Sequence, residues 1–219
     1  MARLQLSDEA AAYVRELVLT GQLKAGEFVR VDRVADELDM SVTPVREGLL
    51  ALRGEGFLEL APRRGFVVAA LSEDDVRDLF WVQAKIAGEL AARAAERLTG
   101  EQLTALESLQ RDLTNALERG NLDEVARCNH DFHRMLNLAA SAPKLTWFLR
   151  TATRYVPHRF YDRVGGWPDA SGHDHVAILD GLRRRDPAAV REAMQEHITH
   201  IGELLIDHAD LPDASGDPG

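Results

Sequence analysis

Eight histidines occur in this chain of 219 residues, and all of them follow residue 72. Asn129 and His133 are four residues apart, so on a helix they share one face. Phe132 and Leu136 predict that this stretch lies near a packed interior. A polar side chain placed there costs free energy unless it finds a partner.

Two later histidines occupy similar positions. His175 comes directly before an apolar stretch, and His197 lies on one helix face with Met194 and Ile201, at spacings of three and four residues. Three imidazoles that converge from three helices would form a metal site with nitrogen ligands. The alternative for any single histidine is a surface or packed residue that binds nothing.

The elements that must position these side chains are helical throughout the second part of the chain. Helical periodicity and breaks at Gly120, Pro143, Pro168 and Pro187 predict six helices, over 74–98, 101–119, 122–140, 143–161, 170–184 and 187–208. Six helices without strands predict an antiparallel bundle, and ligands of such bundles bind between the helices. The polar residues 210–219 are expected to form a disordered tail.

A different pattern occupies the first 71 residues. Ser41 is an expected N-cap, Pro44 fits the first turn of a helix, and Gly56 is suited to its end. The polar face of this helix begins with Ser41, Thr43 and Arg46. The N-terminal end of a recognition helix is where such side chains meet the bases of DNA.

The segments around this helix complete a winged helix-turn-helix. Residues 8–20, with Ser7 as N-cap, and residues 33–38 predict two more helices, and a tight connection at Asp39 joins the last two of the three. Apolar stretches at 57–60 and 66–68 flank a turn that contains Arg63 and Arg64, which predicts a β-hairpin with a basic tip. Such arginines can reach phosphates or the minor groove.

Composition limits the possible functions. The hydrophobic fraction of 45% fits an ordinary globular protein, and we expect a cytoplasmic one, without membrane span, signal peptide or disulfide. The net charge is −10, and residues 1–72 hold 9 Lys and Arg against 11 Asp and Glu. A DNA-binding surface must therefore gather its few cations in one place. Each such surface would contact little DNA, so we expect a homodimer in which two of them bind together.

The first part of the chain resembles the GntR family of transcriptional regulators, in its FadR-like subgroup. The matching stretches are LKAGE at 23–27, VADEL at 34–38 and MSVTPVRE at 40–47, followed by Leu52, Gly56 and Arg64-Gly65. The resemblance implies that a set of residues on the helices and the wing binds DNA: Arg33, Ser41, Thr43, Pro44, Arg46, Arg53, Arg63, Arg64 and Gly65. The chain departs from the family at Asp32 and Val42, where arginine is frequent, so we expect a different operator sequence.

The second part resembles the FCD domain, the helical ligand-binding domain of this subgroup. That domain typically holds a divalent metal through Asp or Asn, a histidine four residues later and two further histidines, which here implies Asn129, His133, His175 and His197. His173 is the rival of His175, and His200 is the rival of His197. Because Asn129 offers a neutral oxygen, we expect Zn²⁺ or Ni²⁺ rather than Mn²⁺.

The resemblance also implies a small-molecule effector beside the metal, often an organic acid. Gln83 stands where the family commonly has an arginine, and it cannot form an ion pair with a carboxylate. The charge for an acid must then come from the metal, Arg150 or Arg154, so Gln83, Arg150 and Arg154 are the candidate pocket residues.

These observations predict a homodimeric, effector-responsive transcription factor, and we expect a repressor. Residues 1–71 would form the DNA-binding domain and residues 72–209 the effector and metal-binding domain, which also dimerises. One alternative is a metal-dependent enzyme such as a hydrolase, for which Asp131 and Glu196 are the nearest candidate general bases. Another is a helical interaction module without ligand.

Overall fold

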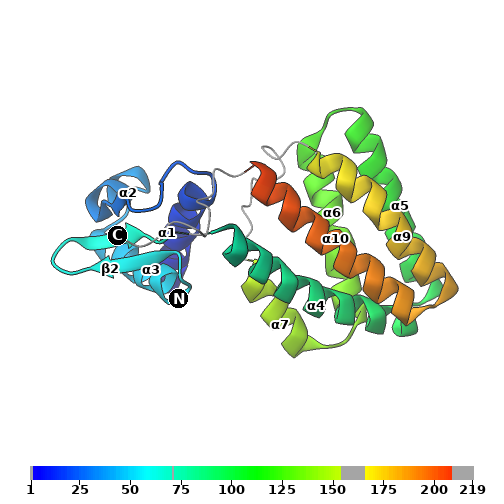
Figure 1. The fold of residues 1–219 in the computed structure, drawn as a ribbon. Helices are drawn as coiled ribbons and strands as arrows, with labels where there is room; N and C mark the ends of the chain where they lie inside the picture. Colours follow the sequence, from blue (N-terminus) through cyan, green and yellow to red (C-terminus); the bar gives the residue numbers. More distant parts are fainter. Residues whose placement is uncertain (1, 71, 154–165, 209–219) are drawn as a thin grey trace. The chain divides into compact units, whose positions relative to one another are not determined.

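The computed structural model describes residues 2–70, 72–153 and 166–208, with side chains from Leu6 onward. Arg154 and the tail 210–219 lie outside these ranges. The chain divides into two compact units, with the boundary in the sequence between Glu73 and Asp74, and each unit has its own hydrophobic core. Figure 1 shows the elements of both units along the chain.

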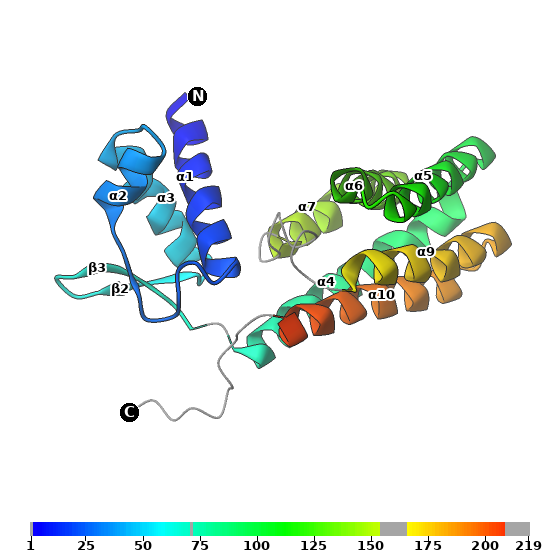
Figure 2. The ribbon, with the colours of Figure 1, turned by 90° about the horizontal axis from the view of Figure 1, so that it is seen from above.

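The first unit is a winged helix-turn-helix, as the sequence predicts. Its helices are α1 (Ala2–Leu19), α2 (Val31–Glu37) and α3 (Val42–Gly54). Its strands are β1 (Phe28–Val29), β2 (Leu58–Ala61) and β3 (Gly65–Val68), which form an antiparallel sheet in the order β1-β3-β2. The β2–β3 hairpin projects from the unit as a narrow tongue (Figure 2).

Local details differ from the prediction at the start of the first helix and in the sheet. Helix α1 begins at Ala2 and not after Ser7, because no residue before Ser7 breaks a helix. The two-residue strand β1 pairs with β3 through Phe28 opposite Val67, which extends the predicted hairpin to three strands. Arg63 and Gly65 adopt positive φ angles of 62° and 94°, which let the chain reverse at the wing tip.

Helix α3 is held by its apolar face. Val45, Leu49 and Leu52 are fully buried in the core of the first unit. Ser41 occupies the N-cap position, but its side chain makes no capping hydrogen bond, contrary to the sequence expectation. Gly56 has φ of 86° and follows the C-cap residue Glu55, so it ends the helix in the left-handed conformation that glycine adopts readily.

The described part of the second unit contains six helices and no strand, as predicted. They are α4 (Glu73–Arg97), α5 (Gly100–Glu118), α6 (Leu122–Ala139), α7 (Pro143–Ala152), α9 (Trp167–Arg184) and α10 (Pro187–His208). Helix α7 ends at Ala152 with Thr153 as its C-cap, whereas the predicted helix continues to 161; residues 154–161 lie outside the described ranges. In the ranges that the structure describes, no helix is long and apolar enough to cross a membrane.

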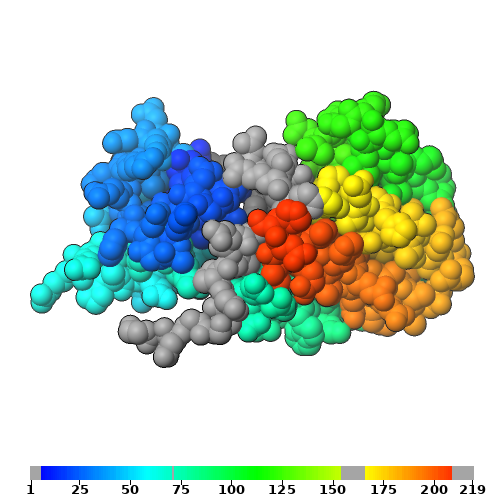
Figure 3. All heavy atoms as spheres, turned by 45° about the horizontal axis from the view of Figure 1, so that its top comes forward, coloured from blue at the N-terminus to red at the C-terminus, as the bar shows by residue number. Residues whose placement is uncertain are grey.

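Tight caps and close helix contacts shape this bundle. Thr99 and Gln102 form a capping box at the start of α5, and Asn121 caps α6. Helices α9 and α10 lie side by side along one face of the unit (Figures 1 and 3), and α5 packs against both α6 and α9. Phe132, Leu136, Ile178 and other apolar side chains fill the space between these helices.

Candidate metal centre and nucleic-acid interface

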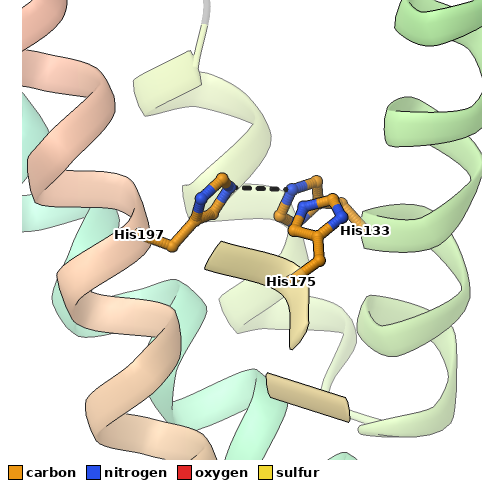
Figure 4. Close-up of side chains that lie close together, drawn as sticks. All are labelled: His133, His175 and His197. Carbon is orange, nitrogen blue, oxygen red and sulfur yellow. Dashed lines mark hydrogen bonds between the residues drawn. The ribbon is translucent and has the colours of Figure 1, made fainter. Parts of the chain in front are cut away.

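Three imidazoles meet inside the helical unit. His133 comes from α6, His175 from α9 and His197 from α10, and their rings face one another (Figure 4). One ligand nitrogen from each ring lies within 4.8 Å of the other two. His133 Nε2 and His197 Nε2 are 3.3 Å apart. Nitrogens bound to one tetrahedral zinc ion are separated by about the same distance, roughly 3.3 Å.

Neighbouring side chains fix the orientation of two of these rings. His175 donates from Nδ1 to Gln110 Oε1 at 2.9 Å, and its ring stacks on Phe132 with centroids 4.2 Å apart. His197 donates from Nδ1 to Asp174 Oδ2 at 3.2 Å. The Nε2 atoms of both rings are therefore left to face the centre of the cluster.

Burial keeps two rings of the cluster uncharged. It lowers the pKa of His133 to about 3, helped by the charges of His197 and His130. Burial also lowers the pKa of His175 well below its ordinary value, with a further contribution from His197 and His133. Burial works to raise the pKa of Asp174, but hydrogen bonds from His197 and His200 outweigh it and hold that pKa below its ordinary value. Neutral imidazoles are the form that binds a metal.

Buried polar atoms beside the histidine cluster are suited to bind a ligand. In the described part of the helical unit, three buried side-chain atoms have no hydrogen-bond partner: Asn129 Oδ1, Ser171 Oγ and His175 Nε2. Such atoms cost free energy unless water, an ion or a ligand meets them. Asn129 and Ser171 each lie one helical turn before a histidine of the cluster. The donor set of imidazole nitrogens and an amide oxygen fits a divalent metal such as Zn²⁺ or Ni²⁺.

The structure distinguishes between the rival histidines. His173 and His200 are exposed, whereas His175 and His197 are buried in the cluster. His200 instead donates to Asp174 Oδ2 at 3.0 Å from the solvent side. Asn129 is buried on α6, one turn before His133, and its role as a ligand stays a proposal.

The candidate effector residues lie in different surroundings. Gln83 is buried on α4 and donates from Nε2 to the carbonyl of Ala152 on α7, at 3.3 Å. Arg150 is exposed and lines a surface groove with Trp147 and Leu138 on the outside of α6 and α7. Arg154 falls outside the described residues. Arg150 therefore faces a groove that contains no residue of the histidine cluster.

The two candidate general bases lie elsewhere. Asp131 Oδ2 pairs with Arg127 Nη1 at 3.5 Å along the surface of α6, and Glu196 is exposed on α10. Sequence reasoning missed the carboxylate that does contact the cluster, Asp174, although it stands between two histidines in HDH. It also missed Gln110 and Ser171, for which the sequence offered no signal.

The candidate DNA-binding side chains lie mostly at the surface of the first unit. The exposed ones are Arg33, Ser41, Thr43, Arg46, Arg53, Arg63 and Arg64. Pro44 is buried at the start of α3. Arg33 donates from Nε to Glu37 at 2.9 Å, and Glu37 also accepts from Tyr13 Oη at 2.6 Å. Arg63, Arg64 and the half-buried Gly65 form the tip of the wing.

The chain combines a winged helix-turn-helix that exposes cations with a helical unit that contains a histidine cluster. This combination is typical of two-domain transcription regulators. Comparison with known families gives the same result. The model for bacterial regulatory proteins of the gntR family matches residues 6–68, and the FCD domain model matches residues 78–200. The chain belongs to the GntR family of transcription regulators that carry an FCD domain.

Curated relatives and solved structures agree with this assignment. The HTH-type transcriptional repressor RspR of Escherichia coli strain K12 is 30% identical over 176 residues, which cover 78% of this chain and 76% of RspR. The HTH-type transcriptional regulator McbR of the same strain is 25% identical over 203 residues, 90% of each chain. The structure of E. coli McbR/YncC shares the fold, with a TM-score of 0.69 and 23% identity, over 92% of this chain and 97% of that one.

Proposed function

We propose that the protein is a homodimeric repressor whose helical unit binds a divalent metal and a small anionic effector, and that the effector changes operator affinity. The observation that carries the proposal is the convergence of His133, His175 and His197 in a chain that also has a winged helix-turn-helix. Residues 1–71 would act as the DNA-binding domain and residues 72–209 as the effector domain. RspR, a relative, is a repressor by name.

The DNA-binding part of the proposal rests on the polar end of α3. Ser41, Thr43 and Arg46 are exposed at its N-terminal end, where a recognition helix enters the major groove. The hydroxyl of Ser41 makes no capping bond within the protein. Arg33, Arg53 and the wing arginines would contact phosphates and set the register of the helix on DNA.

The effector class follows from the charge of the metal centre. Neutral imidazoles and a neutral amide leave a bound dication with its full positive charge. A metal that keeps an open position in such a site favours an anionic oxygen ligand, such as a carboxylate. Gln83, the candidate pocket residue on α4, already donates to a backbone carbonyl, so the metal would supply most of the attraction for an anion.

Dimerisation would involve α4 and α7, which expose large apolar side chains. Trp81 and Val82 on α4 are 61% and 42% exposed, and Trp147 and Phe148 on α7 are 50% and 55% exposed. Gln83 links the two helices through the carbonyl of Ala152. Large exposed apolar groups on neighbouring helices are typical of an association surface.

Operator binding by the full chain tests the proposal. Fluorescence anisotropy with the gene's own upstream DNA, measured with and without Zn²⁺, should show saturable binding that unrelated DNA does not compete away. Arg46→Ala should weaken it by roughly tenfold or more, because each contact to a base contributes about 1–3 kcal/mol. Arg111→Ala removes the same charge from an exposed position on α5 and serves as the control.

The metal part of the proposal has its own readout. Elemental analysis of the purified protein should find about one divalent metal ion per chain, and His133→Ala should lose it.

Absence of specific DNA binding at low salt, with or without metal, would argue against a DNA-binding role. If the protein binds DNA but no metal, the proposed role as a regulator stands, and the proposed binding of an effector through a metal is refuted.

A further inference from the structure

Two side chains outside the histidine cluster determine which nitrogen each ring presents to it. We propose that Gln110 and Asp174 are positioning residues of the metal centre. Each accepts the Nδ1–H of one imidazole and thereby leaves Nε2 of that ring unprotonated and directed to the metal. This inference rests on the proposed metal binding and names the residues that prepare the site for it.

The hydrogen bonds of Gln110 leave only one tautomer for His175. Gln110 Nε2 lies 2.9 Å from the carbonyl oxygen of Gly172, which can only accept a hydrogen bond. The amide nitrogen must therefore face Gly172, and Oε1 must face His175 Nδ1, at 2.9 Å. Because Oε1 cannot donate, Nδ1 carries the hydrogen. The other nitrogen, Nε2, is the buried atom of His175 that has no partner.

The carboxylate of Asp174 fixes His197 in the same way. An ionised carboxylate only accepts, so His197 Nδ1 donates to Oδ2 at 3.2 Å. In the neutral form of this ring, Nε2 of His197 is then unprotonated, and it lies 3.3 Å from His133 Nε2 (Figure 4). His200 donates to the same oxygen at 3.0 Å and so holds the carboxylate from the solvent side.

These two residues also connect the helices around the cluster. Gln110 lies on α5 and binds α9 at two points, the backbone of Gly172 and the ring of His175. Asp174 lies on α9 and binds α10 through His197 and His200. The ring orientations are therefore set before any metal arrives, which lowers the cost of ordering them on binding. Loss of such outer partners typically weakens metal binding by roughly 10–100-fold.

Nuclear magnetic resonance of the metal-free full chain tests the tautomers directly. Long-range ¹H–¹⁵N correlations should show the Nδ1–H form for His175 and His197. Gln110→Leu should abolish that preference at His175 alone, and Asp174→Ala at His197 alone. Asp174→Asn keeps an accepting oxygen and should preserve the tautomer of His197. An Nε2–H form at both rings of the unsubstituted protein would overturn the inference.

Zinc affinity measured against a competing chelator tests the consequence for the metal. Gln110→Leu and Asp174→Ala should each weaken Zn²⁺ binding by roughly 10–100-fold. Asp180→Ala removes a carboxylate from the same helix, where it pairs with Arg183 at the surface, and should bind zinc like the unsubstituted protein. Tryptophan fluorescence during unfolding verifies that each variant is folded.

The outcomes separate this inference from the proposed metal site. If the unsubstituted protein binds zinc, His133→Ala does not, and both positioning variants bind as tightly as the unsubstituted protein, then the metal site stands and the positioning role is refuted. If the unsubstituted protein binds neither zinc nor nickel, the metal site itself fails and the positioning role falls with it. If Gln110→Leu and Asp174→Ala each weaken zinc binding and also abolish the Nδ1–H preference of their histidine, the inference is supported.

Discussion

Three of the four candidate ligands of the metal centre carry no formal charge. Burial holds His133 and His175 in the neutral form, and Asn129 offers only an amide oxygen. Soft and borderline cations such as Zn²⁺ and Ni²⁺ bind well to imidazole, whereas Mn²⁺ prefers carboxylate oxygens. Residue 129 is therefore the position at which a single change should alter the choice of metal.

Asn129→Asp should raise the affinity for Mn²⁺ by roughly tenfold or more, because a carboxylate adds a full negative charge beside the cation. Zinc affinity should change less, since the imidazoles supply most of its bonds. Isothermal titration of both metals into the metal-free protein measures the difference. Asn137→Asp adds the same charge farther along α6 and should leave both affinities unchanged. Equal gains in the two variants would mean that Asn129 is not a ligand.

The buried imidazoles should make the metal-free protein sensitive to acid. The pKa of His133 is about 3 in the folded protein, against 6.5 in an unfolded chain. Between these values the unfolded state binds more protons, so stability is highest above pH 6.5 and falls as the pH is lowered toward 3. Each such ring adds a slope of up to about 1.4 kcal/mol per pH unit.

Urea unfolding of the chelator-treated protein at several pH values measures this slope. All three tryptophans, Trp81, Trp147 and Trp167, lie in the helical unit, so their fluorescence follows that unit alone. His133→Asn removes one titrating ring and should flatten the dependence between pH 7 and pH 4. An unchanged slope would show that His133 is not buried in its neutral form.

At the scale of elements, helix α3 depends on a close approach to α1. A Cβ atom at Gly48 would lie 2.6 Å from the backbone oxygen of Ser7 and 2.9 Å from the backbone nitrogen of Ala11. Neither backbone atom can move without shifting α1. Glycine at this position therefore lets α3 lie closely against α1.

Gly48→Ala should destabilise the DNA-binding unit by about 1–3 kcal/mol, the usual cost of overpacking. Gly54→Ala lies on the same helix with nothing within 4 Å of the added Cβ, and should stabilise the unit by about 0.5–1 kcal/mol. The first unit has no tryptophan, so circular dichroism during thermal unfolding is the measurement. Similar effects of the two substitutions would contradict the close contact between α1 and α3.

At the scale of the whole molecule, the charge distribution argues for paired DNA-binding units. The whole chain has a net charge of −10, and its first 72 residues hold more acidic than basic side chains. A single winged helix of this kind places few cations on DNA. Because phosphate contacts dominate affinity, a dimer that binds two half-sites would bind far more tightly than one unit.

Charged substitutions in the exposed apolar residues of α4 and α7 should break the proposed dimer. Trp81→Glu combined with Phe148→Glu should give monomers in analytical ultracentrifugation, and operator affinity should fall by roughly tenfold or more because only one half-site is then bound by each particle. Val176→Glu changes an apolar residue of α9 that is 49% exposed and serves as the control. A variant that remains dimeric would place the interface elsewhere.

The sequence by itself determined the two-part architecture and the positions of most helices. Caps and breakers such as Thr99, Gly120 and Pro143 act through local backbone chemistry, so they can be read from the chain. The i, i+4 spacing of Asn129 and His133 likewise places both on one helix face before any tertiary contact is known. Sequence reasoning was wrong at Ser7, because no residue before it breaks a helix and α1 begins at Ala2. It also continued the helix after Pro143 past the C-cap residue Thr153.

Only the tertiary structure decided which histidines meet. His173 and His175 are two residues apart, and helix rotation buries one and exposes the other, which spacing alone cannot determine. Gln110 and Asp174 reach the cluster from α5 and α9, across contacts between residues 65 and 23 positions apart. Partners so distant in sequence leave no local pattern, because packing between helices, and not backbone chemistry, brings them together.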